Sequence, residues 1–314
     1  MIHAFVDAVQ VFWDHLAAVR WTPLGIAIAF QLAKLVVRGF AWRNILQAAY
    51  PETAVPRLAT LGAYVAGVGV NAIAPARAGD VVKLYLVKRR IPGASYATLT
   101  PTLVAETLFD MVVGVALIAW ALSLGVLPAH EVYSRLPSVD WGFLLKYEKW
   151  TAVALATLIT LALFGVIIFL EKGEDFRARV GRGFAIMRDP PRFLLHVVLP
   201  QSISWVLRAG TVYYFLRAFQ VHASVHNALL AMVVDSLATL FPATPGGAGT
   251  KQGLIVFLFK GQAVSRPALL AFSVGFNIAT VVFNVVLGAL ALYAMARTLS
   301  WRSVRAAQAE DAAA

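Results

Sequence analysis

The 314-residue sequence contains no cysteine, and charged residues make up only 14% of it. The absence of cysteine excludes disulfides, thiol catalysis and thiolate metal sites, although it does not identify a redox compartment. The scarcity of charge excludes an ordinary soluble domain, in which about a quarter of the residues are charged. The sequence is instead 60% hydrophobic, with a mean hydropathy of +0.74. We therefore expect an all-α polytopic membrane protein with little mass outside the bilayer.

Acidic residues are scarcer than basic ones, with 16 Asp and Glu against 27 Lys and Arg. A strongly basic chain can indicate nucleic-acid binding. Here the basic residues fall in short loops between apolar runs, which is the pattern that orients membrane proteins. We therefore expect a multi-pass protein of the cell inner membrane and no nucleic-acid partner.

Long apolar runs predict full membrane spans, and shorter runs predict interrupted ones. At 1.5 Å per residue, about 20 residues cross the hydrocarbon core. Runs of that length occupy residues 21–41, 97–126, 150–170, 193–219 and 268–296. Shorter apolar runs lie at 58–74 and 227–241, and amphipathic segments follow them at 81–90 and 251–260. We predict about five to eight transmembrane helices.

Proline and glycine interrupt the apolar sequence in two places, at residues 71–80 and 241–251. Lipid tolerates broken backbone only where protein or trapped water satisfies the freed amide groups. A matched pair of interrupted segments is the best sequence indication of a transporter's substrate site. We predict two re-entrant hairpins, with hinge and gating residues Asn71, Pro75, Gly79, Pro242, Pro245, Gly246, Gly247 and Gly249.

The distribution of basic residues predicts that the two hairpins are inverted. Segments 38–57 and 77–95 both carry an excess of basic residues, although an apolar run separates them. A re-entrant hairpin explains this pattern, because it leaves the membrane on the face that it entered. Segment 171–192 and the tail after residue 297 are also basic, whereas segment 127–149 is balanced. By this count the second hairpin enters from the outer face and the C-terminus is cytoplasmic.

An internal match supports two repeats, at about residues 21–126 and 193–297. Pro75 and Pro242 each begin a Pro-Ala-x-x-Gly pattern, and the same offset aligns Asp110 with Asn277. The helical apolar period of residues 1–20 predicts an amphipathic helix, which is either interfacial or the outer end of the first span. The predicted organisation is this helix, a transmembrane domain at 21–297 and a disordered cytoplasmic tail at 298–314.

Three motifs resemble those of a known family. They read Asn71-x-x-x-Pro75-x-Arg77-x-Gly79-Asp80, Glu106-x-x-x-Asp110 and Pro242-x-x-Pro245-Gly246-Gly247-x-Gly249. Together they resemble the lysylphosphatidylglycerol synthase transmembrane-region family, which includes the flippase half of the bacterial multiple peptide resistance factor. The resemblance extends from about residue 20 to residue 297. It implies lipid translocation through a transmembrane domain.

Two positions depart from the pattern of this family. Gln252 stands where the family often has Glu, and Asp80 stands where its first motif commonly ends in Glu. The sequence ends at Ala314, so we expect no soluble aminoacyl-transferase domain of the kind that makes lysyl lipid. The resemblance therefore implies a transporter rather than an enzyme.

Charged residues beside the hairpins are candidates for substrate binding, because a polar head group needs a polar path across the bilayer. Arg77, Asp80 and Lys83 lie at or beside the end of the first hairpin, and Lys251 lies at the end of the second. We expect Arg77 to bind a lipid phosphate on the inner face and Lys251 to do so on the outer face. The alternative is that these basic residues only set topology and extend toward the membrane surface.

Acidic residues within an apolar span form a second group of candidates. Glu106 and Asp110 are four residues apart, so they share one face of a helix. They indicate a substrate or proton site, with a structural ion pair to Arg208 as the alternative. Arg208 itself is a candidate for holding the phosphate at the midplane, and Asp235 is placed to neutralise Arg208 or Lys251.

The function predicted from these features is a membrane lipid transporter or flippase for a phospholipid or polyprenyl-linked lipid. The alternatives are a secondary carrier of a small soluble ion or metabolite, and a non-transporting partner of a membrane glycosyltransferase or lipid synthase. His222 and His226 have no third ligand nearby in the sequence, so we expect no metal and no cofactor. Gly- and Ala-rich spans are compatible with a monomer, a homodimer or a complex with a lipid-modifying enzyme.

Overall fold

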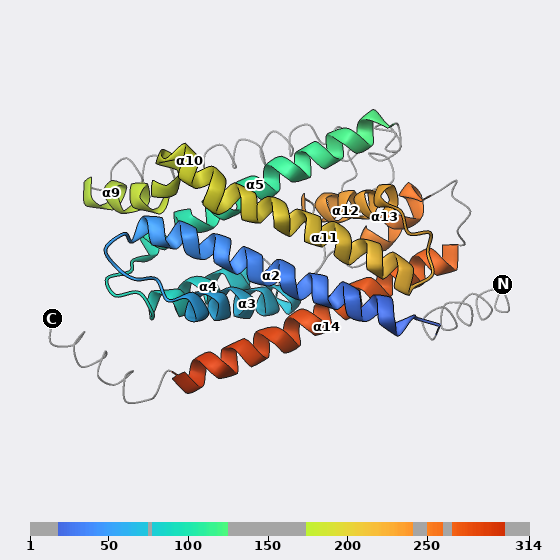
Figure 1. The fold of residues 1–314 in the computed structure, drawn as a ribbon, viewed down its shortest axis with the longest axis horizontal. Helices are drawn as coiled ribbons and strands as arrows, with labels where there is room; N and C mark the ends of the chain where they lie inside the picture. Colours follow the sequence, from blue (N-terminus) through green and yellow to red (C-terminus); the bar gives the residue numbers. More distant parts are fainter. Residues whose placement is uncertain (1–17, 75–76, 125–173, 241–249, 260–265, 299–314) are drawn as a thin grey trace, which may run out of the picture.

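The computed structural model describes residues 18–74, 77–124, 174–240, 250–259 and 266–298, and every regular element in these ranges is a helix (Figure 1). Three helices in this part of the chain are long and apolar enough to cross a membrane: α2 (Trp21–Ala49), α5 (Tyr96–Ser123) and α14 (Arg266–Thr298). These helices confirm an all-helical membrane protein and the predicted spans near 21–41, 97–126 and 268–296. The predicted span at 150–170, the N-terminal segment up to residue 17 and the tail from residue 299 lie outside the described residues.

The first span extends further than its apolar run, because α2 continues from residue 41 to Ala49. The sequence prediction assigned Arg38 both to the span at 21–41 and to the basic segment at 38–57; the structure places it within the span, which is longer than predicted. At 1.5 Å per residue, the 29 residues of α2 extend about 44 Å, beyond the roughly 30 Å of the hydrocarbon core. Arg38 therefore lies well inside the helix, where its charge needs partners.

Two pairs of short helices correspond to the interrupted apolar runs. In the first half, α3 (Arg57–Ile73) and α4 (Ala78–Lys88) pack against each other. In the second half, α12 (Val225–Leu240) packs against α13 (Thr250–Leu258). Figure 1 shows the two pairs in opposite halves of the molecule. Each pair stands between two longer helices in the chain.

The predicted span at 193–219 corresponds to one long helix, α11 (Leu199–Ala218), and to the short helical segments that lead into it. These segments are α9 (Glu174–Gly183), η1 (Ala185–Arg188), α10 (Pro190–Phe193) and η2 (Leu194–Val198). Pro190 and Pro191 stand at the first positions of α10, where a missing amide proton costs nothing. The side chain of Asp189 caps this helix by accepting a hydrogen bond from the backbone of Arg192.

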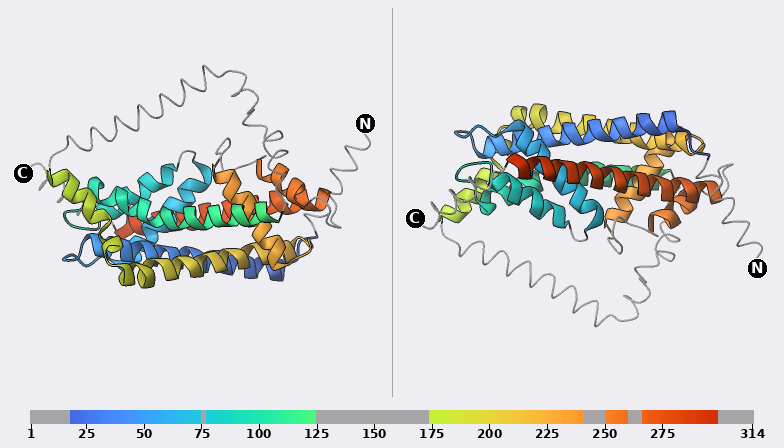
Figure 2. Two further views of the ribbon diagram at one scale, coloured as in Figure 1. Left: turned by 90° about the horizontal axis from the view of Figure 1, so that it is seen from above. Right: turned by 90° about the horizontal axis from the view of Figure 1, so that it is seen from below.

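The helices form two layers. Helices α2 and α11 pack side by side and run in opposite directions, and Figure 2 shows α5, α14 and the short pairs on one side of them. Helix α14 packs along α3, where a Cβ on Gly69 would lie only 2.7 Å from the Cα of Gly288. Paired small residues of this kind let the backbones of two membrane helices approach closely.

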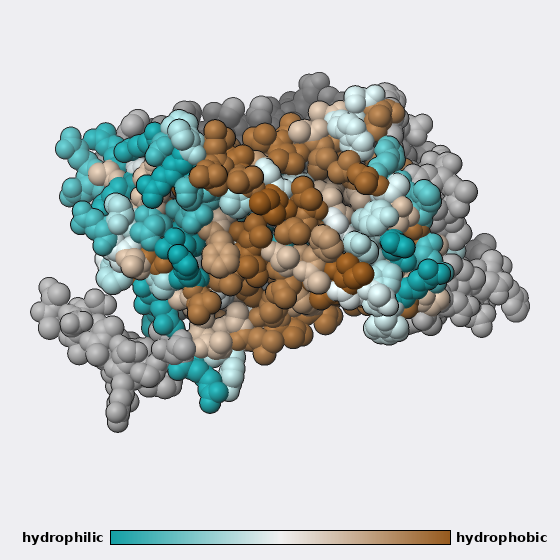
Figure 3. Space-filling model, viewed as in Figure 1, coloured by the Kyte–Doolittle hydropathy of each residue, from teal (hydrophilic) through white to brown (hydrophobic). Residues whose placement is uncertain are grey.

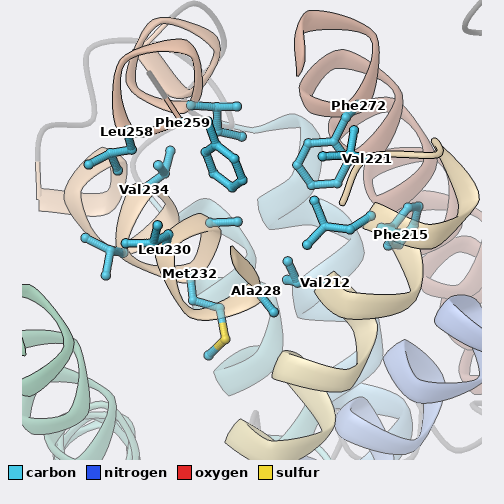
Figure 4. Close-up of a cluster of buried hydrophobic side chains, with 14 of the residues drawn as sticks. Val212, Phe215, Val221, Ala228, Leu230, Met232, Val234, Leu258, Phe259 and Phe272 are labelled. Carbon is cyan, nitrogen blue, oxygen red and sulfur yellow. The ribbon is translucent and has the colours of Figure 1, made fainter. Parts of the chain in front are cut away.

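Two apolar clusters hold these helices together. One cluster joins α11, α12, α13 and α14 through side chains such as Phe215, Leu230 and Phe272 (Figure 4). The other joins α2, α3, α4 and α5, with Trp42 and Leu46 fully buried at its centre. Each cluster therefore surrounds one pair of short helices.

The face of the molecule drawn in Figure 3 divides into three zones along the long axis. Figure 3 shows a broad hydrophobic band between two hydrophilic ends. The end of the molecule that holds the C-terminus of α2 also holds α9 and η1, because both pack against α2. The loop after α4 lies at this end too, because Ser95 donates its amide to the hydroxyl of Tyr50. The basic residues of the loops after α2 and α4 and of α9 therefore meet at one end, as their charge predicts.

Candidate functional site

Arg38 of α2 is the centre of a partly buried ion-pair network. Its Nη1 lies 2.9 Å from Asp110 Oδ1, and its Nη2 donates to Asp110 Oδ2 and, at 3.0 Å, to Glu106 Oε1. The remaining Nε donates to the hydroxyl of Tyr64 at 2.8 Å. An arginine bound on all sides by oxygen acceptors is well suited to bridge two carboxylates. The network joins α2, α3 and α5.

Lys83 of α4 completes this network from the first pair of short helices. Its ammonium lies 3.0 Å from Glu106 Oε2 and 3.8 Å from Asp80 Oδ1. The same ammonium lies over the rings of Trp42 and Tyr64, at 4.8 and 4.5 Å from their centroids. The side chain of Lys83 is only 6% exposed, so its charge is compensated by carboxylates and aromatic faces rather than by water.

Helix α11, which packs beside α2, also contacts these two acidic residues. Trp205 Nε1 donates to Asp110 Oδ1 at 2.9 Å, and Gln201 Nε2 donates to the backbone oxygen of Glu106 at 2.9 Å. The middle of α5 is therefore bound by both α2 and α11, although most of the outer face of α5 is open.

Asp235 of α12 is the centre of a second network. Arg208 of α11 lies 3.3 Å from it, and Lys251 of α13 lies 3.0 Å from it. These contacts confirm that Asp235 is placed to neutralise both basic residues. The alternative pairing of Arg208 with Glu106 and Asp110 is wrong, because Arg38 and Lys83 occupy that position.

The backbone conformation is unusual where α4 begins, and the residues of the first motif, from Asn71 to Asp80, explain why. Arg77 has a left-handed conformation, with φ of 59°, which is uncommon for a residue other than glycine. Two residues later, Gly79 donates its amide to Asn71 Oδ1 at 2.7 Å, and Asn71 Nδ2 bonds to Asp80 at 3.2 Å. A Cβ on Gly79 would collide with the backbone oxygen of Gly67. Glycine is thus required where α3 and α4 meet.

A cavity of about 470 Å³ lies between α5, α11, α12 and Arg77. Its polar wall includes the guanidinium groups of Arg77 and Arg208, together with Asp110 and Ser236. Its apolar wall belongs to α5 and contains Met111, Gly114, Val115 and Ile118. The side chain of Arg77 is 68% exposed, and Met111 and Val115 are also exposed. The cavity therefore has a cationic wall and an apolar wall that continues onto the outer surface.

The sequence matches the family described as lysylphosphatidylglycerol synthase TM region over residues 4–288. The chain belongs to this family. A relative is the UPF0104 membrane protein of Methanocaldococcus jannaschii, which is 22% identical over 241 residues, covering 73% of this chain and 95% of that protein. No solved structure matches the chain.

The family's first two motifs meet in the Arg38 network, since Asp80, Lys83 and Glu106 are linked there. Pro75 of the first motif lies outside the described residues. So do Pro242, Pro245, Gly246, Gly247 and Gly249 of the third. The structure thus brings together the charged candidates of the first half around Arg38, and those of the second half around Asp235.

Several residues of the site were missed by the sequence prediction. Arg38 was counted only as a topology signal, and Tyr64, Gln201 and Trp205 were not considered. A signal was present, because Lys34, Arg38 and Trp42 are spaced four residues apart and share one helical face. Asn284 of α14 accepts a hydrogen bond from Gln31 of α2 at 3.1 Å, so it links these two helices.

Proposed function

We propose that this member of the family is a lipid transporter, which moves a phospholipid or polyprenyl-linked lipid across the membrane without changing it chemically. The cavity carries this proposal. Arg77 and Arg208 supply two guanidinium groups suited to a phosphate, and the α5 wall supplies apolar contacts beside them. A lipid has these same two parts, with a polar head joined to apolar tails. The tails would remain in the bilayer while the head group occupies the cavity.

We further propose that the chain lies in the plasma membrane with its long axis along the bilayer normal. The hydrophobic band between hydrophilic ends supports this orientation. Basic residues of the loops after α2 and α4, and of α9, gather at one end, which the positive-inside rule assigns to the cytoplasm. Helix α14 ends with Arg297 toward the same end of the molecule in Figure 1. This orientation makes the C-terminus cytoplasmic.

In this proposal the two short-helix pairs are re-entrant hairpins in inverted repeats. Both halves have the order long helix, two short helices, long helix, and α2 runs opposite to α11. Neither α3 nor α12 has the roughly 20 residues needed to span the core. The pairs lie in opposite halves of the molecule, which suits entry from opposite faces. Inverted repeats of this kind commonly place a transport site where their interrupted helices meet.

The two ion-pair networks give this transporter a means of alternating exposure. The Arg38 network holds the first pair of short helices to α5, and the Asp235 network holds the second pair to α11. If one pair of short helices moved away, its ion-pair network would break and the cavity would open to one face of the membrane. The network of the other pair would stay intact and keep the opposite face closed. Lipid or proton gradients would supply the energy.

Reconstituted vesicles that contain a trace of tail-labelled fluorescent phospholipid test this proposal. Wild-type protein should move the probe from the inner to the outer leaflet, where an impermeant quencher reaches it. An Arg77→Ala/Glu106→Gln variant should lose this activity. The matched control is Arg89→Ala/Glu52→Gln, which changes the same charges at exposed positions. Equal activity of wild type and the site variant would refute the mechanism. Uptake of a soluble tracer without lipid movement would indicate a small-molecule carrier instead.

A further inference from the structure

Helix α5 contains a proline in its interior, Pro101. Because proline has no amide proton and its ring crowds the preceding turn, α5 lacks the backbone hydrogen bond to Ala97 that another residue would make here. The next residue adds to this effect, since the hydroxyl of Thr102 donates to the backbone oxygen of Leu99 at 2.6 Å. Local side-chain bonds of this kind compete with the regular helix. The turn that ends at Thr102 is therefore suited to act as a hinge.

The part of α5 before this hinge is fixed to its neighbours. Leu99 is fully buried in the apolar cluster that joins α2 to α5, and Trp42 of α2 donates its Nε1 proton to Thr102 Oγ1 at 3.2 Å. Helix α9 packs so closely against α5 that a Cβ on Gly183 would collide with the backbone oxygen of Thr98. The start of α5 is thus held by α2 and α9 together.

The part beyond the hinge, the distal segment of α5 (residues 103–123), is held differently. Among its described side chains, the fully buried hydrophobic ones are those of two alanines, Ala105 and Ala121. The larger hydrophobic side chains described there are partly buried or exposed. Polar contacts of Glu106 and Asp110 supply much of its attachment. A segment that buries little apolar surface separates from its neighbours at a low cost in free energy.

The distal segment also forms one wall of the cavity. Every α5 residue that lines the cavity, from Thr107 to Ile118, lies beyond Pro101. At the seam with α12, a Cβ on Gly114 would lie 3.9 Å from the Cβ of Ser236, and both residues line the cavity. Gly114 stands about 20 Å along the helix from Pro101. A small change of tilt at the hinge therefore opens this seam more than it displaces the acidic residues near the hinge.

We propose that the distal segment of α5 is a lateral gate, which pivots at Pro101 and opens the cavity to the bilayer between Gly114 and Ser236. This inference rests on the proposed lipid transport and adds the route by which the lipid enters. A head group can occupy the cavity while its tails stay in the bilayer only if one wall opens toward the lipid. Met111 and Val115 line the cavity and are exposed, so they offer apolar contacts to the tails at this opening.

A disulfide across the seam tests the gate. The 3.9 Å between the two Cβ positions suits a disulfide, and the chain has no other cysteine. Oxidised Gly114→Cys/Ser236→Cys should lose lipid transport, and reduction should restore it. The two single variants, treated with the same oxidant, are the matched controls and should keep their rates. Undiminished transport by the fully cross-linked double variant would overturn the gate while leaving lipid transport established.

The hinge is tested by Pro101→Ala, which restores the missing amide and stiffens α5. We expect slower lipid transport with no fall in the midpoint of thermal unfolding. Pro267→Ala is the matched control, because Pro267 lies in the first turn of α14, where the amide has no partner within the helix. This control should keep the wild-type rate. A wild-type rate in Pro101→Ala would overturn the assignment of the hinge.

Distances between spin labels separate this inference from the transport proposal. Labels at Ser123→Cys and Arg217→Cys connect the end of the distal segment to an exposed position on α11. In lipid vesicles this pair should give two distances, and Pro101→Ala should leave one of them. The control pair, Tyr96→Cys and Arg217→Cys, places its α5 label before the hinge and should give a single distance.

The outcomes for the two proposals are distinct. If the Ser123 pair shows two distances but no lipid moves in any variant, the transport proposal fails and the gate motion stands. If the Ser123 pair shows one distance that Pro101→Ala leaves unchanged, the gate fails even where lipid moves.

Discussion

Arg38 and Asp110 lie on different long helices and are joined by two hydrogen bonds, one from each Nη atom of the guanidinium. The same carboxylate accepts a hydrogen bond from Trp205 of α11. A single acid on α5 thus connects α2, which belongs to the first half of the chain, with α11, which belongs to the second. This contact joins the two halves through one partly buried carboxylate.

Removing Arg38 should destabilise the protein strongly. Arg38→Gln leaves Asp110 without a basic partner in the described network and Glu106 with Lys83 alone. Breaking a buried ion pair from one side typically costs about 3–5 kcal/mol. We expect a clear fall in the midpoint of thermal unfolding in detergent. Arg89→Gln, at an exposed position, is the control, and equal midpoints for both variants would show that the network is not structural.

Removing Arg208 should impair transport more than stability. Arg208→Ala deletes a guanidinium from the cavity wall, while Lys251 still neutralises Asp235. Loss of a charge-assisted hydrogen bond of about 1.5–3 kcal/mol predicts a tenfold or greater fall in lipid translocation. Arg217→Ala, in the last turn of the same helix, should keep the wild-type rate. Wild-type translocation by Arg208→Ala would remove Arg208 from the substrate path.

The substitution Gly79→Ala, which adds one methyl group, should push α3 and α4 apart. The new Cβ would overlap the backbone oxygen of Gly67 and lie 2.7 Å from Asn71 Oδ1. Because the obstacle includes backbone, the helices must shift, and we expect lower thermal stability and little transport. Gly253→Ala on α13 is the control, since nothing lies within 4 Å of its added Cβ. Only Gly79→Ala should lower the midpoint of thermal unfolding and the rate of lipid transport. Similar values for the two variants would contradict the close packing of α3 against α4.

The absence of cysteine allows the orientation to be measured directly. Single cysteines at Arg89 and Arg182, both exposed, should react with an impermeant maleimide from the cytoplasmic side. A cysteine at Arg217, which is also exposed, should react from the outer side. Labelling in intact cells and in inverted vesicles distinguishes the two faces. Reaction of Arg89→Cys and Arg217→Cys from the same face would contradict the proposed orientation.

Much of the helical layout was predictable, because it follows from the length of apolar runs. Helix α3 matches the run at 58–74 within a residue at each end, and α12 matches 227–241 within two. The pairing of Asp235 with Arg208 and Lys251 was also predictable. An acid between two basic residues in a poorly charged region has few other partners.

The Arg38 network was harder to predict, because its members are distant in the sequence. Arg38 and Asp110 are separated by 72 positions, and no short sequence pattern predicts that α2 packs beside α5. Arg38 also lies where the predicted span at 21–41 overlaps the basic segment at 38–57, and its charge was counted only with that segment. Lys83 was hard to place for a different reason. A basic residue in an amphipathic segment is usually exposed, but here carboxylate and aromatic partners allow the ammonium to be buried.

The most direct test of the central claim is to fill the cavity and measure lipid movement. Ser236 lines the cavity and Ser123 is exposed near the end of α5, so Ser236→Cys and Ser123→Cys offer matched single thiols in a cysteine-free chain. Both variants should move phosphatidylglycerol before modification. A bulky thiol reagent should then stop lipid movement in Ser236→Cys and leave Ser123→Cys unaffected. Undiminished lipid movement by fully modified Ser236→Cys would show that the head group does not pass through this cavity.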